Sequence, residues 1–220
     1  MTGVVRPAVL GALVAVAALV LSGCGGSSSS TPTAGGASGS PGATSSVAVP
    51  KGVSLTPQGT SLKVGQPATV AWQPTQKKVG VAKIAVTRLQ KVPISAFSSF
   101  QLDPVTRRST PYYVHATVQN AGSSDLSHVA VPLYALENNT LLQPSTFQAQ
   151  YTPCSSRPFP AHFKPGSKAS VCLVYFVPHH GKLDAISFRP TQDFAAITWH
   201  GTVHVVKPHH HGHKSKKQQH

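Results

Sequence analysis

The chain has 220 residues, and its 19 Lys and Arg residues outnumber its five Asp and Glu residues, so its formal net charge is +14 at pH 7. A balance this positive favours polyanionic partners. Five carboxylates leave little material for reaction mechanisms that require two of them at one site.

The first 23 residues have the organisation of an export signal. A single cation, Arg6, precedes an apolar run from Pro7 to Leu21, and Ser22 and Gly23 supply the small residues that a signal peptidase needs. The run is shorter than the roughly 20 apolar residues that a membrane-spanning helix requires. We therefore predict a cleaved signal at 1–23 and no retained transmembrane helix there.

The tetrapeptide Leu21-Ser22-Gly23-Cys24 resembles the lipobox of bacterial lipoproteins. That resemblance implies that Cys24 is acylated, becomes the first residue of the mature chain and anchors it to the extracytoplasmic face of the cell membrane. The alternative is an ordinary secretory signal in which a cysteine falls at this position by chance.

Composition divides the rest of the chain into three parts. Residues 24–50 follow the signal and, after Cys24, consist almost entirely of Gly, Ser, Thr, Ala and Pro without a charge, which predicts a disordered tether. Such a chain of 26 residues has a root-mean-square reach of roughly 28 Å. Residues 51–206 are long enough for one domain with a substantial core, and 207–220 form a His- and Lys-rich tail predicted to be disordered.

Seven segments of 51–206 have the composition of β-strands. In chain order they are 68–73, 79–92, 112–119, 129–137, 171–177, 185–188 and 197–205. Most alternate apolar and polar residues, which predicts strands with one buried and one solvated face. Seven or eight antiparallel strands with almost no helical pattern predict an all-β sandwich.

Three of these segments depart from simple alternation. The phase of the apolar residues slips near Leu89, and Pro132 predicts an edge strand or a bulge in 129–137. Every residue of 171–177 is apolar, which is typical of a strand covered on both faces.

The chain resembles exported actinobacterial lipoproteins that carry an immunoglobulin-like domain of unknown function. The resemblance rests on strand and turn motifs at 65–67 (Gly-Gln-Pro), 120–123 (Asn-Ala-Gly-Ser), 163–166 (Phe-Lys-Pro-Gly) and 172–178 (Cys-Leu-Val-Tyr-Phe-Val-Pro). It covers roughly 62–201 with the signal and tether, and it implies an immunoglobulin-like sandwich, displayed at the surface, without catalytic residues. The two downstream cysteines are only 18 positions apart with no Trp between them, unlike those of antibody domains.

The three cysteines can be assigned by arithmetic. If Cys24 carries lipid, then Cys154 and Cys172 remain as a pair in an exported protein, where disulfides form. We predict a bridge between them, which would stabilise the fold by roughly 3 kcal/mol. The alternative is two unrelated free thiols.

The charge predicts the class of partner. Residues 51–206 contain 14 basic and five acidic residues, a net charge of 14 − 5 = +9. Outside a cell the matching polyanions are anionic lipid headgroups, phosphate-bearing wall polymers and acidic glycans. We find no motif for specific nucleic-acid binding. A basic surface that serves only solubility is the competing interpretation.

Histidines in the tail suggest a different function. His209, His210, His211 and His213 are the candidate ligands. Clustered imidazoles bind Zn²⁺, Ni²⁺ or Cu²⁺, although a flexible tract fixes no geometry and selects no metal. His200 and His204 are expected on one face of the strand 197–205, about 13 Å apart and too distant to share a metal.

The sequence contains no recognisable catalytic motif. G-x-S-x-G, H-E-x-x-H, the P-loop and G-x-G-x-x-G are all absent, so we expect no enzyme and no cofactor. The leading hypothesis is a lipid-anchored binding or structural module that contacts an anionic envelope component. The alternatives are a metal-binding lipoprotein that acts through its tail and a protein–protein adaptor.

Overall fold

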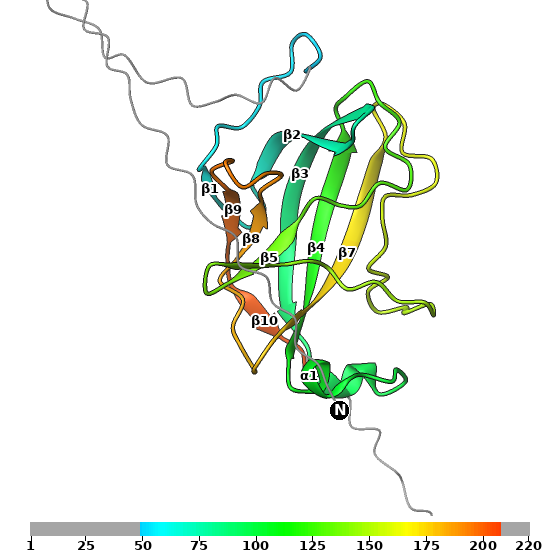
Figure 1. Ribbon diagram of the computed structural model, residues 1–220, viewed down its shortest axis with the longest axis vertical. Helices are drawn as coiled ribbons and strands as arrows, with labels where there is room; N and C mark the ends of the chain where they lie inside the picture. The colour runs from blue at the N-terminus through cyan, green and yellow to red at the C-terminus, as the bar shows by residue number, and fades with distance from the viewer. Residues whose placement is uncertain (1–48, 208–220) are drawn as a thin grey trace, which may run out of the picture. The chain divides into compact units, whose positions relative to one another are not determined.

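The computed structural model describes residues 49–207, which form a β-sandwich of ten strands (Figure 1). The predicted lipidation site Cys24, the tether up to residue 48 and the tail histidines His209, His210, His211 and His213 lie outside the described residues. The predicted all-β sandwich is confirmed.

One sheet, here called the large sheet, has the strand order β10-β3-β4-β7, with β2 also paired to β3. Its strands are β2 (Pro67–Thr75), β3 (Lys78–Lys91), β4 (Thr110–Asn120), β7 (Lys168–Val177) and β10 (Val203–Val205).

The small sheet has the order β1-β9-β8-β5-β6. Its strands are β1 (Ser61–Lys63), β5 (Tyr134–Glu137), β6 (Thr140–Leu142), β8 (Ala185–Phe188) and β9 (Ile197–His200). Two short helices, η1 (Ile94–Phe97) and α1 (Pro104–Arg107), lie between β3 and β4.

The main core lies between the inner faces of the two sheets. Apolar side chains from alternate positions of β2, β3, β4 and β7 meet those of β5, β8 and β9, and the cluster includes Trp72, Tyr175 and Trp199. Two of these large rings have partners for their polar atoms: the Trp199 indole donates to the Gln66 carbonyl at 2.9 Å, and the Tyr175 hydroxyl donates to the Leu133 carbonyl at 2.8 Å. Tyr175 and Trp199 can therefore be fully buried without leaving unpaired donors.

Several predicted features are confirmed at the residue level. Strand β8 spans the predicted 185–188. The predicted phase slip in β3 is a register shift between Val86 and Arg88. Strand β7 is covered on both faces along its second half, because Leu173 and Tyr175 belong to the main core while Val174 belongs to a separate cluster on the other face.

The prediction of one strand over 197–205 was wrong. This segment is two strands in different sheets, with β9 paired to β8 and to β1, and β10 paired to β3. Gly201 lies at the crossing, where a Cβ atom would stand 2.6 Å from Cγ2 of Val64. The pairings of β10 with β3 and of β9 with β1 are parallel. The sandwich is therefore mostly antiparallel, whereas the sequence pattern predicts antiparallel strands throughout.

The prediction for 129–137 was also wrong. Only Tyr134–Glu137 forms a strand, and this β5 is paired on both sides, to β6 and to β8, rather than lying at an edge. Pro132 precedes it because proline has no N–H to donate to a neighbouring strand.

Asn120 ends β4 and organises the turn that follows. Its side chain is buried, with Nδ2 donating to the carbonyls of Ser124 and Phe163 at 2.9 Å each, while Oδ1 accepts from the Gly122 N–H at 3.1 Å. The turn composition of this segment therefore reflects one buried amide that joins β4 to the loop before β7.

Replacing Asn120 with Ala should lower the free energy of unfolding by about 2–4 kcal/mol, because three hydrogen bonds are lost and two carbonyls lose a donor. Urea unfolding of Asn120→Ala measures this loss. Ser123→Ala, an exposed change in the same turn, is the control and should leave stability unchanged. Equal stability of the two variants would contradict the role given to Asn120.

Candidate functional site: the open outer face of the large sheet

The outer face of the large sheet is divided into a covered half and an open half. The covered half lies under a set of aromatic side chains that we call the aromatic cap. The cap consists of Phe97, Phe100, Phe147, Tyr151 and Phe176, packed on Tyr113 of β4. Phe97 is fully buried in it, with its ring centroid 4.8 Å from that of Phe176 and 4.9 Å from that of Tyr151.

The cap overturns part of the predicted pattern. The alternation over 112–119 predicts that Tyr113 and His115 lie on the solvated face, whereas Tyr113 is only 7% exposed and His115 is half-buried. The Tyr113 and Tyr151 hydroxyl groups are hydrogen-bonded to each other, and burial raises the pKa of both. Apart from Phe176 of β7, the cap residues lie between β3 and β4, where Phe97 ends the short helix η1, or in the loop before β7, and no alternation predicts their position.

The predicted bridge between Cys154 and Cys172 is confirmed, with the two Cα atoms 5.2 Å apart. It fastens the loop that carries Phe147 and Tyr151 to strand β7. Two hydrogen bonds of Ser156 reinforce the attachment: its N–H donates to the Cys172 carbonyl at 3.0 Å, and its hydroxyl accepts from the Val174 N–H at 2.9 Å.

His115 marks the border between the two halves. It lies opposite Arg88 on β3 and opposite Cys172 on β7 in the strand register. Its Nε2 is 2.8 Å from Gln90 Oε1 and 3.2 Å from Arg88 Nη2. Burial lowers the pKa of His115, and the neighbouring Arg88 charge lowers it further.

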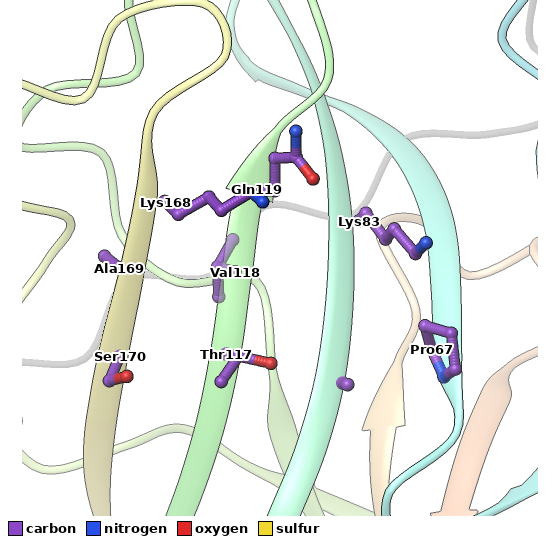
Figure 2. Close-up of a pocket in the computed structure, with 9 residues that line it drawn as sticks. Pro67, Lys83, Thr117, Val118, Gln119, Lys168, Ala169 and Ser170 are labelled. Carbon is purple, nitrogen blue, oxygen red and sulfur yellow. The ribbon is translucent and has the colours of Figure 1, made fainter.

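The open half of the face is built from two rows of residues that lie across the strands. The first row is Lys83, Gln119 and Lys168, and the second is Ala85, Thr117 and Ser170. Together with Pro67 of β2 they line an open hollow of about 390 Å³ (Figure 2). Period-two alternation places these side chains on the face opposite the core.

Charge on this face has one sign. The ranges of β2, β3, β4, β7 and β10 contain no Asp or Glu. Lys83 and Lys168 are exposed on the open half, and Arg88 is exposed at its border with the cap. Thr87 is the extra residue of the bulge in β3, and because it shifts the alternation by one, Arg88 reaches the outer face while Leu89 turns into the core.

The carboxylates lie on turns instead. Asp103 accepts from the N–H groups of Val105 and Thr106 as the N-cap of α1, and Asp125 accepts from the Ser127 N–H at 2.8 Å. Hydrogen bonds from the Thr106 and Ser127 side chains are the main reason why the pKa values of Asp103 and Asp125 are lowered. Both acids thus cap backbone amides at turns.

Two carboxylates come together at one hairpin. Asp184 Oδ2 accepts from the Asn138 N–H at 2.7 Å, and Glu137 Oε1 accepts from the Asn138 side-chain amide at 3.1 Å. Asn138 and its neighbour Asn139 have positive φ, as a tight hairpin turn requires. Both carboxylates are thus engaged in fixing the turn between β5 and β6.

No metal centre is found among residues 49–207, in which His, Cys, Asp and Glu form no group of three that could hold an ion. The expectation that His200 and His204 share one strand face was wrong, because they belong to β9 and β10 in different sheets. Within the same described range, no helix is long and apolar enough to cross a membrane.

Comparison with known proteins gives no family assignment. No family model and no curated protein sequence matches the chain. Among solved structures, the chain is similar to MPT63, a secreted protein from Mycobacterium tuberculosis, at 16% identity with a TM-score of 0.42. The similarity covers 66% of this chain and 98% of that protein.

Removing the disulfide should destabilise the fold by about 2–4 kcal/mol and loosen the cap, because the closed loop no longer limits the unfolded chain. Urea unfolding of the double variant Cys154→Ala/Cys172→Ala measures the loss against the parent protein with and without reductant. The reduced parent should match the double variant. Unchanged stability in both would contradict the role of the bridge in holding the cap.

Acidification should destabilise the protein partly through His115. Because the pKa of His115 is lowered on folding, the unfolded chain binds more protons than the folded one once the pH falls below about 6.5. The stability contributed by neutral His115 is therefore present above that pH and is lost as the pH falls toward the lowered pKa. His115→Gln should show a smaller decrease in Tm between about pH 7.5 and pH 5 than the parent.

The control for this measurement is His128→Gln, which alters an exposed histidine. It should retain the pH dependence of the parent. If His115→Gln also retains it, then the half-buried imidazole of His115 is not the group responsible for the pH dependence.

Proposed function

We propose that this protein is an extracytoplasmic, non-enzymatic binding module that is held at the membrane by acylated Cys24 and binds an anionic component of the cell envelope. The open outer face of the large sheet is the binding surface. The observation that carries the proposal is the charge of this face, where Lys83, Lys168 and Arg88 are presented by strands that contain no carboxylate.

Export is supported by two independent features. The N-terminal segment has the three parts of a signal, and Cys154 is bridged to Cys172, which is typical of proteins that mature in an oxidising compartment. Lipid anchoring depends on the resemblance of residues 21–24 to a lipobox. The immunoglobulin-like assignment depends on the resemblance of the strand and turn motifs to exported actinobacterial lipoproteins.

Binding without catalysis fits the residues of the open half. The hollow is lined by lysines, hydroxyl groups, one amide and small apolar residues, and its lining contains no His, Cys, Asp or Glu. Thr117 and Ser170 therefore have no histidine or carboxylate among the lining residues to activate them as nucleophiles. Ammonium and hydroxyl groups on a rigid sheet serve instead to attract and orient an anion.

The proposal predicts binding that depends on salt and on the open face. Residues 25–220 should bind immobilised heparin, a generic polyanion, and the affinity should fall steeply between about 50 and 500 mM NaCl because exposed charges are screened. Lys83→Gln/Lys168→Gln should weaken binding at low salt by about tenfold, the equivalent of roughly 1.4 kcal/mol.

The matched control is Lys77→Gln/Lys182→Gln, which removes two exposed charges outside the open half. Its binding should remain within about twofold of the parent, a difference that corresponds to less than 0.5 kcal/mol. Equal losses in the two double variants would show that only the net charge matters and would contradict a defined binding face.

A further inference from the structure

We infer that the ligand of the open face is a hydroxyl-rich polymer with anionic groups repeated along it, such as an acidic glycan or a polyol phosphate, and that it lies across strands β7, β4 and β3. The inference rests on the proposed function. It adds the chemical class of the ligand and its direction across the sheet.

The spacing of the cations argues for an extended ligand. Lys83 and Lys168 are separated by β4, so their Cα atoms stand two strand spacings apart, about 9.6 Å. In Figure 2 the Lys168 side chain extends over β4 toward Gln119, whereas the Lys83 side chain extends toward β2, so the two ammonium groups do not aim at one point. In this arrangement the two ammonium groups lie over different parts of the face, which matches a ligand that carries more than one anionic group.

Arg88 extends the charged path along β3. It lies five residues after Lys83 on the same outer face, because the bulge at Thr87 restores it to that side. The path between these two residues is about 13–16 Å at the rise of a strand. An anion-bearing chain can satisfy all three cations, whereas a small anion in an open hollow leaves most of them unused.

Neutral hydrogen-bonding groups fill the space between the cations. Gln119 lies between Lys83 and Lys168 in the first row, and Thr117 and Ser170 are exposed in the second row. A hydroxyl or an amide both donates and accepts, which matches the hydroxyl groups of a sugar or polyol. A ligand that carried charge alone could use these groups only as donors, whereas a hydroxyl-rich ligand can use them both as donors and as acceptors.

Two other classes of polyanion fit the face less well. Single-stranded nucleic acids bind through aromatic side chains on which bases stack, and the lining of the open half contains no aromatic residue. Lipid surfaces favour exposed large apolar side chains. In the described range these are Leu55, Val105 and Val205, and none of them lines the hollow.

The test compares one charge variant and one hydroxyl variant of residues 25–220 on several probes. The probes are poly(glycerol phosphate), hyaluronate, oligothymidylate, phosphatidylglycerol vesicles and inorganic phosphate. Thr117→Val/Ser170→Ala removes two exposed hydroxyl groups and leaves every charge of the protein in place. It should weaken binding to poly(glycerol phosphate) or to hyaluronate about fivefold while leaving oligothymidylate binding unchanged.

The polymer that responds identifies whether the repeated anion is a phosphate or a carboxylate. Inorganic phosphate at millimolar concentration should fail to compete with it. Thermal unfolding shows whether each variant remains folded, and Ser123→Ala, outside the face, is a further control for the binding measurements.

The outcomes separate this inference from the proposed function. If Lys83→Gln/Lys168→Gln weakens binding to every polyanion while Thr117→Val/Ser170→Ala binds all of them like the parent, the face binds anions but does not recognise a hydroxyl-rich polymer, and the inference is overturned. The inference is also overturned if the protein binds oligothymidylate or the vesicles more tightly than it binds both poly(glycerol phosphate) and hyaluronate. If the lysine variant changes no binding at all, the proposed function itself fails.

Discussion

The large sheet can bury only one of its faces against the small sheet, and the rest of the structure follows from how the other face is treated. Half of that outer face is covered by the aromatic cap, which the bridge between Cys154 and Cys172 ties to β7. The remaining half is left to solvent and carries Lys83, Lys168 and neutral polar groups. A single sheet thus provides the main core, a second small core and a rigid charged surface.

The border between the two halves explains why the open half is both rigid and basic. His115 and Cys172 lie opposite each other where the cap ends, so the strands that leave the cap are already fixed by packing on both faces. The bulge at Thr87 adds Arg88 to the same face. Because the acids are used at turns, such as Asp103 at the start of α1 and Asp125 before Ser127, the cations of the face are not neutralised by their own strands.

Much of the sandwich could be predicted because its signals are local. Alternation in β2 and β4, the phase slip in β3 and the continuous apolar run in β7 each depend on neighbouring residues. The cap could not be predicted, because Phe97 of the short helix η1 and Tyr151 of the loop before β7 belong to no periodic pattern and meet over Tyr113 only in the folded chain. The change of sheet at Gly201 was missed for a related reason: the alternation of apolar and polar residues continues from β9 into β10 although the chain crosses from one sheet to the other.

Of the candidate site, the sequence predicted only the positive net charge. Its location could not be predicted, because bringing Lys83 and Lys168 onto one row requires strand pairings across 85 positions of sequence.

The central claim is that the open face, and no other part of the described surface, contacts an anionic polymer. Amide chemical shifts of ¹⁵N-labelled protein, followed during titration with poly(glycerol phosphate), locate the contact residue by residue. The account predicts that the largest changes fall on Lys83, Thr117, Gln119, Lys168 and Ser170, with small changes in the strands of the small sheet. Changes centred on the small sheet or spread evenly over the lysines of the domain would contradict it.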